Sequence, residues 1–148
     1  MINKILQAVM PKKRMIDMFT FKMEGKLSAV QTAAKVEAVC QEFNFALLTT
    51  YIYHDILESK GFPISRKVFI YNVCQAKTAS MMLTTNPEFS TFMPCTLSIY
   101  EENGKTIIST MNMGLMLKAL KSNRELYDQS AGLFQTLVLL MKKLGTEK

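Results

Sequence analysis

The stretch FMPCTLSIYEENGKT, residues 92–106, decides the expected fold, because it predicts a β-hairpin and fixes its register. The Asn-Gly pair at 103–104 lies between two segments of alternating apolar and polar residues, which is the strongest short-range signal for a hairpin. With this pair in the turn, Ile99 lies opposite Ile108. Cys95 shares their face of the hairpin, so its thiol is expected to point toward the apolar side of a sheet.

The rest of the chain supplies strands and helices around this hairpin. Alternation and β-branched or aromatic residues predict strands at residues 15–23, 45–53 and 67–73. A possible helical turn follows the second of these strands. Helical spacing predicts helices at 28–43 with Ser28 as N-cap, between Cys74 and Pro87, at 115–120, and at 123–144 with Asn123 as N-cap. The order β-α-β-β-α-β-β-α indicates a single α+β domain over residues 15–148.

The first of these helices is expected to bury one apolar face against the sheet. Helical spacing places Cys40 on this face, so Cys40 is predicted to be a core thiol. The other residues predicted to be buried there are Val30, Ala33, Ala34, Val36, Val39 and Phe43.

Composition excludes several classes of protein. The chain has 148 residues, of which 49% are hydrophobic, which fits one globular domain and argues against disorder. The net charge of +6 comes from the two ends, since residues 27–112 carry six basic and seven acidic side chains. A nucleic-acid groove needs a basic stripe across the folded body, so no nucleic-acid partner is expected.

The cysteines and the N-terminus indicate a cellular compartment. Cys40, Cys74 and Cys95 are an odd number of cysteines without C-x-x-C spacing, so free thiols in a reducing cytoplasm are expected. The first residues lack the features of a secretory signal, and no apolar run is long enough to span a membrane. Residues 1–14 instead predict an amphipathic helix with a basic edge. This helix would dock on the domain or a partner subunit, or contact the inner membrane face peripherally.

Two segments carry a resemblance to a known family. The run VFIYNVCQAKTASMML, residues 68–83, and the run MPCTLSIYEENGKTIISTMN, residues 93–112, resemble the bacterial and archaeal family called domain of unknown function 302. Met93, Pro94 and Cys95 match its Met-Pro-Cys motif. Cys74 and Lys77 match its Cys-Asn-Pro-Lys-like turn, in which this chain has Gln-Ala in place of Asn-Pro.

The resemblance covers roughly residues 15–120. A histidine after the second strand is also common in the family, and His54 lies there. The resemblance implies an antiparallel-rich sheet flanked by helices, similar to the TATA-box-binding-protein fold, and a twofold homodimer. It implies no function, and a fold shared with a DNA-binding protein does not imply DNA binding.

The predicted topology suggests which of these residues meet. If the helix after Cys74 crosses over the sheet, it starts the fourth strand at the end where His54 lies. His54 and Cys95 would then form a pair, and Cys74 could join them only across a dimer. Cysteine and histidine together suit a transition metal, heme iron or a base-assisted thiolate, with Met93, Pro94 and Lys77 shaping the site. Cys74, at a helix N-terminus, is expected to favour the thiolate form.

Two functional hypotheses follow. In the first, the protein is a binding module for a small ligand, heme or a metal, linked to redox or sulfur chemistry. In the second, it is a protein-protein or membrane-surface module that acts through Met1–Arg14, with cysteines and a histidine that are purely structural. We found no nucleophile elbow, P-loop or dinucleotide-binding motif, so no catalytic residue is assigned and binding is favoured over an enzyme activity.

Overall fold

The predicted hairpin forms and lies at the centre of the sheet. In the computed structural model, which describes residues 12–146, β4 (Cys95–Glu102) pairs antiparallel with β5 (Lys105–Met111), and Ile99 lies opposite Ile108. Asn103 and Gly104 have φ angles of 51° and 73°. Positive φ at both central residues is the type I′ turn that Asn-Gly favours. The predicted register is therefore confirmed.

The other strands extend this hairpin on both sides. β1 (Thr20–Gly25) pairs with β5, β3 (Val68–Cys74) pairs with β4, and β2 (Ala46–Ile52) pairs with β3. All four pairings are antiparallel, and the strand order is β1-β5-β4-β3-β2. The predicted α+β fold with an antiparallel sheet and flanking helices is confirmed.

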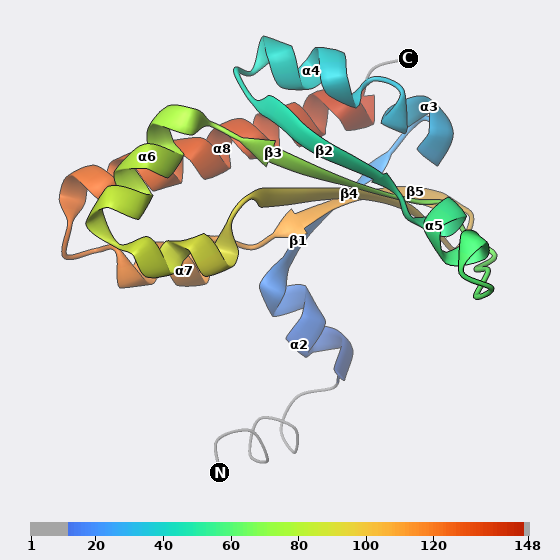
Figure 1. Ribbon diagram of the computed structural model, residues 1–148, viewed down its shortest axis with the longest axis horizontal. Coiled ribbons are helices and arrows are strands. Elements are labelled where there is room, and N and C mark those ends of the chain that lie inside the picture. The colour runs from blue at the N-terminus through green and yellow to red at the C-terminus, as the bar shows by residue number, and fades with distance from the viewer. Residues whose placement is uncertain (1–11, 147–148) are drawn as a thin grey trace.

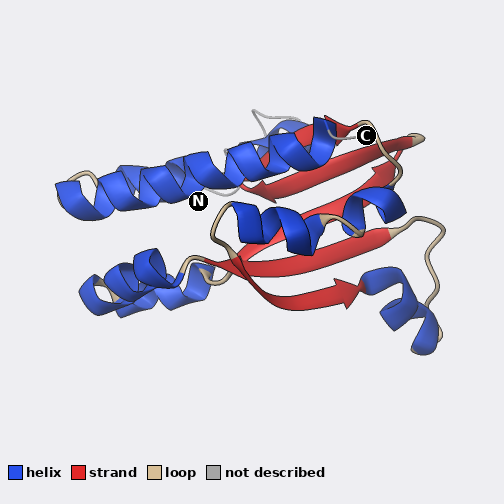
Figure 2. Cartoon of the chain, turned by 90° about the horizontal axis from the view of Figure 1, so that it is seen from above, coloured by secondary structure: helices blue, strands red, loops and turns tan. Residues whose placement is uncertain are grey.

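One layer of helices covers one face of the sheet. Figure 1 shows α3 (Ala29–Ala33), α4 (Val36–Glu42) and α8 (Arg124–Thr146) on this face, and Figure 2 shows them from above. The predicted cap of α8 is confirmed, because the Leu126 N–H donates to Asn123 Oδ1 over 3.0 Å. The main core lies between these helices and the sheet, and its fully buried members include Val36, Cys40, Val73, Leu97, Ile99, Ile108, Leu137, Leu140 and Leu144.

A second, smaller core lies beyond one end of the sheet. It is formed by α6 (Ala76–Thr85), the 3-10 helix η1 (Pro87–Phe92), α7 (Gly114–Ala119) and the first half of α8. Its buried members are Met82, Phe89, Leu120 and Leu126. At the opposite end of the sheet lies α5 (Tyr53–Ser59), where a helical turn was predicted. The sheet therefore separates two different ends of the molecule.

The N-terminal part of the prediction needs a correction. Residues 15–23 were predicted as a strand, but α2 (Lys12–Phe19) occupies the first part and β1 begins at Thr20. Thr20 Oγ1 donates to the Ile16 carbonyl over 3.0 Å, a bond of helical spacing that closes α2. The alternation that suggested a strand is real only over the last four residues. The predicted amphipathic helix over residues 1–14 falls largely outside the described residues.

The predicted helix 28–43 is correct at its start and wrong in its middle. Ser28 is the N-cap of α3, as the sequence predicted, and the structure adds a capping box with Gln31. The helix is interrupted after Ala33 and resumes as α4, which changes the face that each turn presents to the sheet. Val30 is consequently 54% exposed, and Ala34 is also exposed, although both were predicted to be buried. Val36, Val39 and Cys40 are buried as expected.

Candidate functional site

The Met-Pro-Cys motif brings Cys95 beside Cys74. Cys95 opens β4 and lies opposite Val73 in the antiparallel pairing with β3, and Cys74 is the next residue of β3. The Met93–Pro94 peptide bond that precedes Cys95 is cis. The two cysteines therefore lie at the same end of the sheet within one chain.

This placement corrects the predicted pairing of His54 with Cys95. We expected the helix after Cys74 to cross the sheet, which would make β3 and β4 parallel. Instead α6 and η1 stay beyond the sheet end and pack on each other and on α8, so the chain returns to the end that it left. His54 follows the other end of β2, near the start of β3. His54 and the two cysteines therefore cannot bind the same metal or heme iron within one chain.

A cavity of about 340 Å³ lies where the two cysteines meet the second core. Its lining is mainly apolar and comes from β2, the β3–α6 junction, α6, the η1–β4 junction and α8. The residues used below are Leu48, Cys74, Ala79, Met82, Met93 and Cys95. The Met-Pro-Cys motif thus lines a cavity, but Cys95 lies there beside Cys74 and not, as had been expected, beside His54.

A β-bulge turns one leucine toward this cavity. The register between β2 and β3 shifts between Leu47 and Thr49, so Leu48 has no direct partner on β3. A bulge of this kind reorients the side chain that it displaces. Leu48 is among the residues that line the cavity. Sequence reasoning missed it, because alternation along the strand gives no signal for a bulge.

The Cys95 thiol is neutral at ordinary pH. Burial, with a smaller contribution from the neighbouring Cys74, raises the pKa of Cys95 from 9.0 to about 11. Burial also raises the pKa of Cys40 to about 11, as expected for a thiol in the main core. Because the thiolate is the reactive form, Cys95 offers an apolar, polarisable sulfur rather than a nucleophile.

Two other predicted site residues lie elsewhere. Lys77 is exposed in the first turn of α6 and does not line the cavity. The His54 side chain is only 10% exposed, and its ring packs edge-on against Phe69 with centroids 5.1 Å apart. His54 therefore shapes the far end of the sheet and not the cysteine site.

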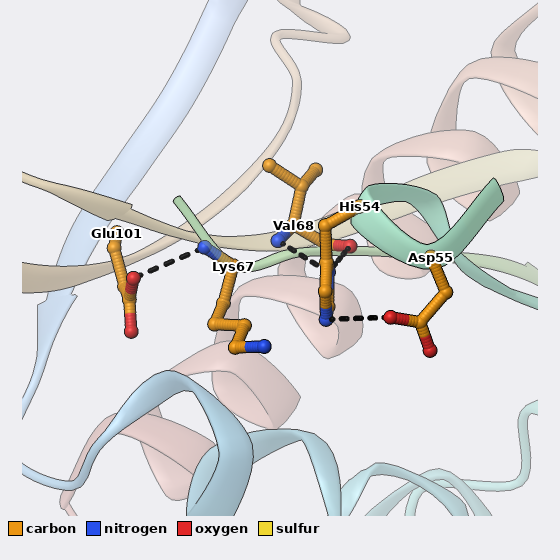
Figure 3. A network of polar contacts seen from close by, with 5 residues as sticks. All are labelled: His54, Asp55, Lys67, Val68 and Glu101. Carbon is orange, nitrogen blue, oxygen red and sulfur yellow. Dashed lines mark hydrogen bonds and ion pairs between the residues drawn. The ribbon is translucent and has the colours of Figure 1, made fainter. Parts of the chain in front are cut away.

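The polar contacts of His54 are with the backbone at the start of β3. The Val68 N–H donates to His54 Nδ1 over 3.1 Å, and Nε2 lies 3.6 Å from Asp55 Oδ1 (Figure 3). Nδ1 also lies 3.1 Å from the Val68 carbonyl oxygen, so it can accept from or donate to the backbone of Val68 according to its tautomer. Among residues 12–146, no three His, Cys, Asp or Glu side chains are grouped so that they could hold a metal ion.

The comparisons with known proteins agree on a family and on a fold. A family model described as a domain of unknown function, DUF302, matches residues 20–144. The crystal structure of an uncharacterized conserved DUF302 protein from Bacillus stearothermophilus is similar, with a TM-score of 0.74 and 25% sequence identity over 86% of this chain and 98% of that one. No curated protein matches the chain.

Proposed function

The chain belongs to the DUF302 family of unknown function, and from that premise we propose that it is a binding module for a small apolar molecule, held in the cavity between Cys74 and Cys95. The cavity carries this proposal. Its volume of about 340 Å³ lies at the lower end of the range for ligand sites, roughly 300–1,000 Å³. A compact molecule is therefore the ligand that fits.

The lining supports an apolar ligand. Burial keeps Cys95 protonated, so this wall of the cavity carries no charge at neutral pH. Met82 and Met93 add two thioethers to it. Methionine is flexible and polarisable, and surfaces rich in it adapt to ligands of different shape. Such a wall favours a hydrophobic molecule over an anion or a cation.

The metal, heme and redox parts of the hypothesis have less support. The two thiols and the histidine lie at opposite ends of the sheet, so one chain does not bring Cys and His ligands together. A redox or sulfur-transfer role would require a reactive thiolate, and the raised pKa of Cys95 works against one. The lining of the cavity therefore favours an apolar ligand over a metal, heme or a redox role.

The experiment uses 1-aminoanthracene, a neutral fluorophore that brightens in apolar sites, as the probe. Ala79 lies on α6, lines the cavity and is half-buried, so Ala79→Leu places three extra carbons in the site. We expect this variant to bind the probe at least ten-fold more weakly than the wild type. Ala38→Leu, at an exposed position of α4, is the matched control and should bind normally.

Circular dichroism and thermal unfolding must show that both variants are folded. If folded Ala79→Leu binds 1-aminoanthracene as tightly as Ala38→Leu, the cavity is not the binding site and the proposal fails. Native mass spectrometry of the freshly purified protein adds a second readout, since a co-purifying small molecule should be retained by Ala38→Leu and lost from Ala79→Leu.

A further inference from the structure

The loop between α5 and β3 is exposed throughout its length. It comprises residues 60–67, KGFPISRK, and all eight are exposed to solvent. Phe62 is 75% exposed and Ile64 is 40% exposed. Figure 1 shows this loop at the end of the molecule opposite α6, and Figure 2 shows α5 and the loop projecting from the body. Two large apolar side chains therefore stand at an exposed tip of the molecule.

The first half of the loop has a defined backbone structure. Gly61 has a φ of +85°, its N–H donates to the Glu58 carbonyl, and the Phe62 N–H donates to the Leu57 carbonyl, both over 2.9 Å. These two bonds make a Schellman motif at the end of α5. In this motif the residue at the position of Phe62 commonly packs back on the helix, at the position of Leu57. The high exposure of Phe62 shows that its ring projects into solvent instead.

The second half of the loop is fixed where it joins the sheet. The Lys67 N–H donates to Glu101 Oε2 over 3.0 Å, and the Glu101 N–H donates to the Lys67 carbonyl over 3.2 Å. The backbone N–H of the next residue, Val68, donates to His54 Nδ1 (Figure 3). Hydrogen bonds with Glu101 and His54 thus hold the end of the loop where it joins β3. A partner would meet Phe62 and Ile64 without having to order a flexible segment first.

The charge of the loop is positive. Lys60, Arg66 and Lys67 flank the two apolar residues, and the loop contains no acidic residue. Within residues 12–146, none of these three side chains takes part in an ion pair. Carboxylates border the second half of the loop on two sides. Asp55 and Glu58 of α5 line a polar pocket of about 210 Å³ together with Ile64, Arg66 and Lys67, and Glu101 and Glu102 line a second pocket with Ser65 and Arg66. The loop itself is thus basic, and acidic side chains of α5 and β4 lie beside its second half.

We propose that residues 60–67 dock the protein on a membrane surface that contains anionic lipid. Phe62 and Ile64 would enter the boundary between headgroups and acyl chains, and the three basic side chains would contact lipid phosphates. Apolar side chains flanked by Lys and Arg bind anionic bilayers in this way, and each added base strengthens the attraction. This site is separate from the cavity and does not depend on its function.

The test is co-sedimentation of the full chain with vesicles of phosphatidylcholine alone or mixed 3:1 with phosphatidylglycerol. We expect Phe62→Ser/Ile64→Ser to lower the partition coefficient on mixed vesicles at least ten-fold. Leu139→Ser is the matched control, because Leu139 on α8 is 53% exposed and lies outside the loop. Lys60→Gln/Arg66→Gln/Lys67→Gln should remove the preference for anionic vesicles and its salt dependence.

A second readout reports the depth of insertion. The chain contains no tryptophan, so Phe62→Trp introduces a single one. Its emission should shift to the blue on mixed vesicles, while that of Leu139→Trp should not. The proposal is overturned if Phe62→Ser/Ile64→Ser binds vesicles like Leu139→Ser, or if Phe62→Trp emission does not shift. Unchanged vesicle binding together with a changed oligomeric mass would overturn it in favour of a protein contact.

Discussion

At the scale of single residues, burial strongly raises the pKa values of three groups within the described part of the chain. Burial raises the pKa values of Cys40 and Cys95 from 9.0 to about 11 and that of Tyr71 from 10.0 to about 12. Each group is neutral when protonated, and the folded protein holds its proton more tightly than the unfolded chain does. Their contribution to stability is therefore complete below about pH 9 and is lost as the pH rises toward 11 and 12.

We expect the free energy of unfolding to fall steeply between pH 9 and pH 11. Cys95→Ala removes one of the responsible groups, so it should reduce this alkaline loss by about 1–2 kcal/mol, whatever it costs at pH 7. Urea unfolding at pH 7, 9 and 10.5 measures the stability of each protein at pH 7 and its loss of stability at alkaline pH. An alkaline loss of the same size in the variant and the wild type would show that Cys95 does not titrate in this range.

The residue-scale predictions from sequence succeeded where the local pattern was sufficient. Cys40 was assigned to the core from helical spacing alone, and it is fully buried. The hairpin register predicted that the Cys95 side chain points to the apolar face of the sheet, and Cys95 does pack against the main core. His54 could not be assigned in this way, because its surroundings depend on which end of the sheet each connection reaches.

At the scale of elements, α8 contains one polar group that the fold buries without compensation. Ser130 lies within α8 at a fully buried position, and its hydroxyl makes no hydrogen bond with the residues that the structure describes. An unsatisfied buried hydroxyl costs about 1–3 kcal/mol, and alanine is also the better helix former. Helical spacing places Ser130 on the same face of α8 as the buried Leu126 and Leu133, but spacing does not reveal whether the hydroxyl finds a hydrogen-bond partner.

Ser130→Ala is therefore expected to raise the free energy of unfolding by about 1 kcal/mol. Ser80→Ala is the matched control, because Ser80 is exposed within α6 and the substitution changes only helix propensity there. Urea or thermal unfolding of the two variants separates the contributions. A destabilised Ser130→Ala, with Ser80→Ala near neutral, would mean that the hydroxyl has a favourable partner.

The elements differ in how well the sequence predicts their arrangement. The β4–β5 hairpin was predicted to the residue, because a two-residue Asn-Gly turn fixes strand pairing locally. The β3–β4 connection was predicted wrongly, because its path depends on α6 packing on α8 about 50 residues further along the chain. The strand predicted at residues 15–23 failed for a local reason, since its first half also fits a helical pattern.

At the scale of the whole molecule, the two proposed binding sites lie at opposite ends of the sheet. The cavity lies at the end of β3 that contains Cys74, and the basic loop enters β3 at Val68. Variants at one end should therefore leave the other end unchanged, and each set serves as a further control for the other. Among residues 12–146, no helix is both long and apolar enough to cross a bilayer.

The homodimer implied by the family resemblance remains a prediction at this scale. Alternation along the strands places Ile70, Tyr100 and Ile107, all half-buried, on the face of the sheet opposite α8. If a second copy covers this face, light scattering should give twice the mass of one chain, and Ile70→Glu should reduce it to one. A single-chain mass for the wild type at every concentration would refute the dimer.

The methionines of the second core have a spectroscopic consequence. Met81, Met93 and Met116 pack against the cluster that contains Met82, and two of these four line the cavity. A protein grown with methionine that is carbon-13-labelled at its terminal methyl group would therefore carry reporters inside the site. Their NMR signals would move when any small molecule enters, so unlabelled mixtures could be screened without knowing the ligand beforehand.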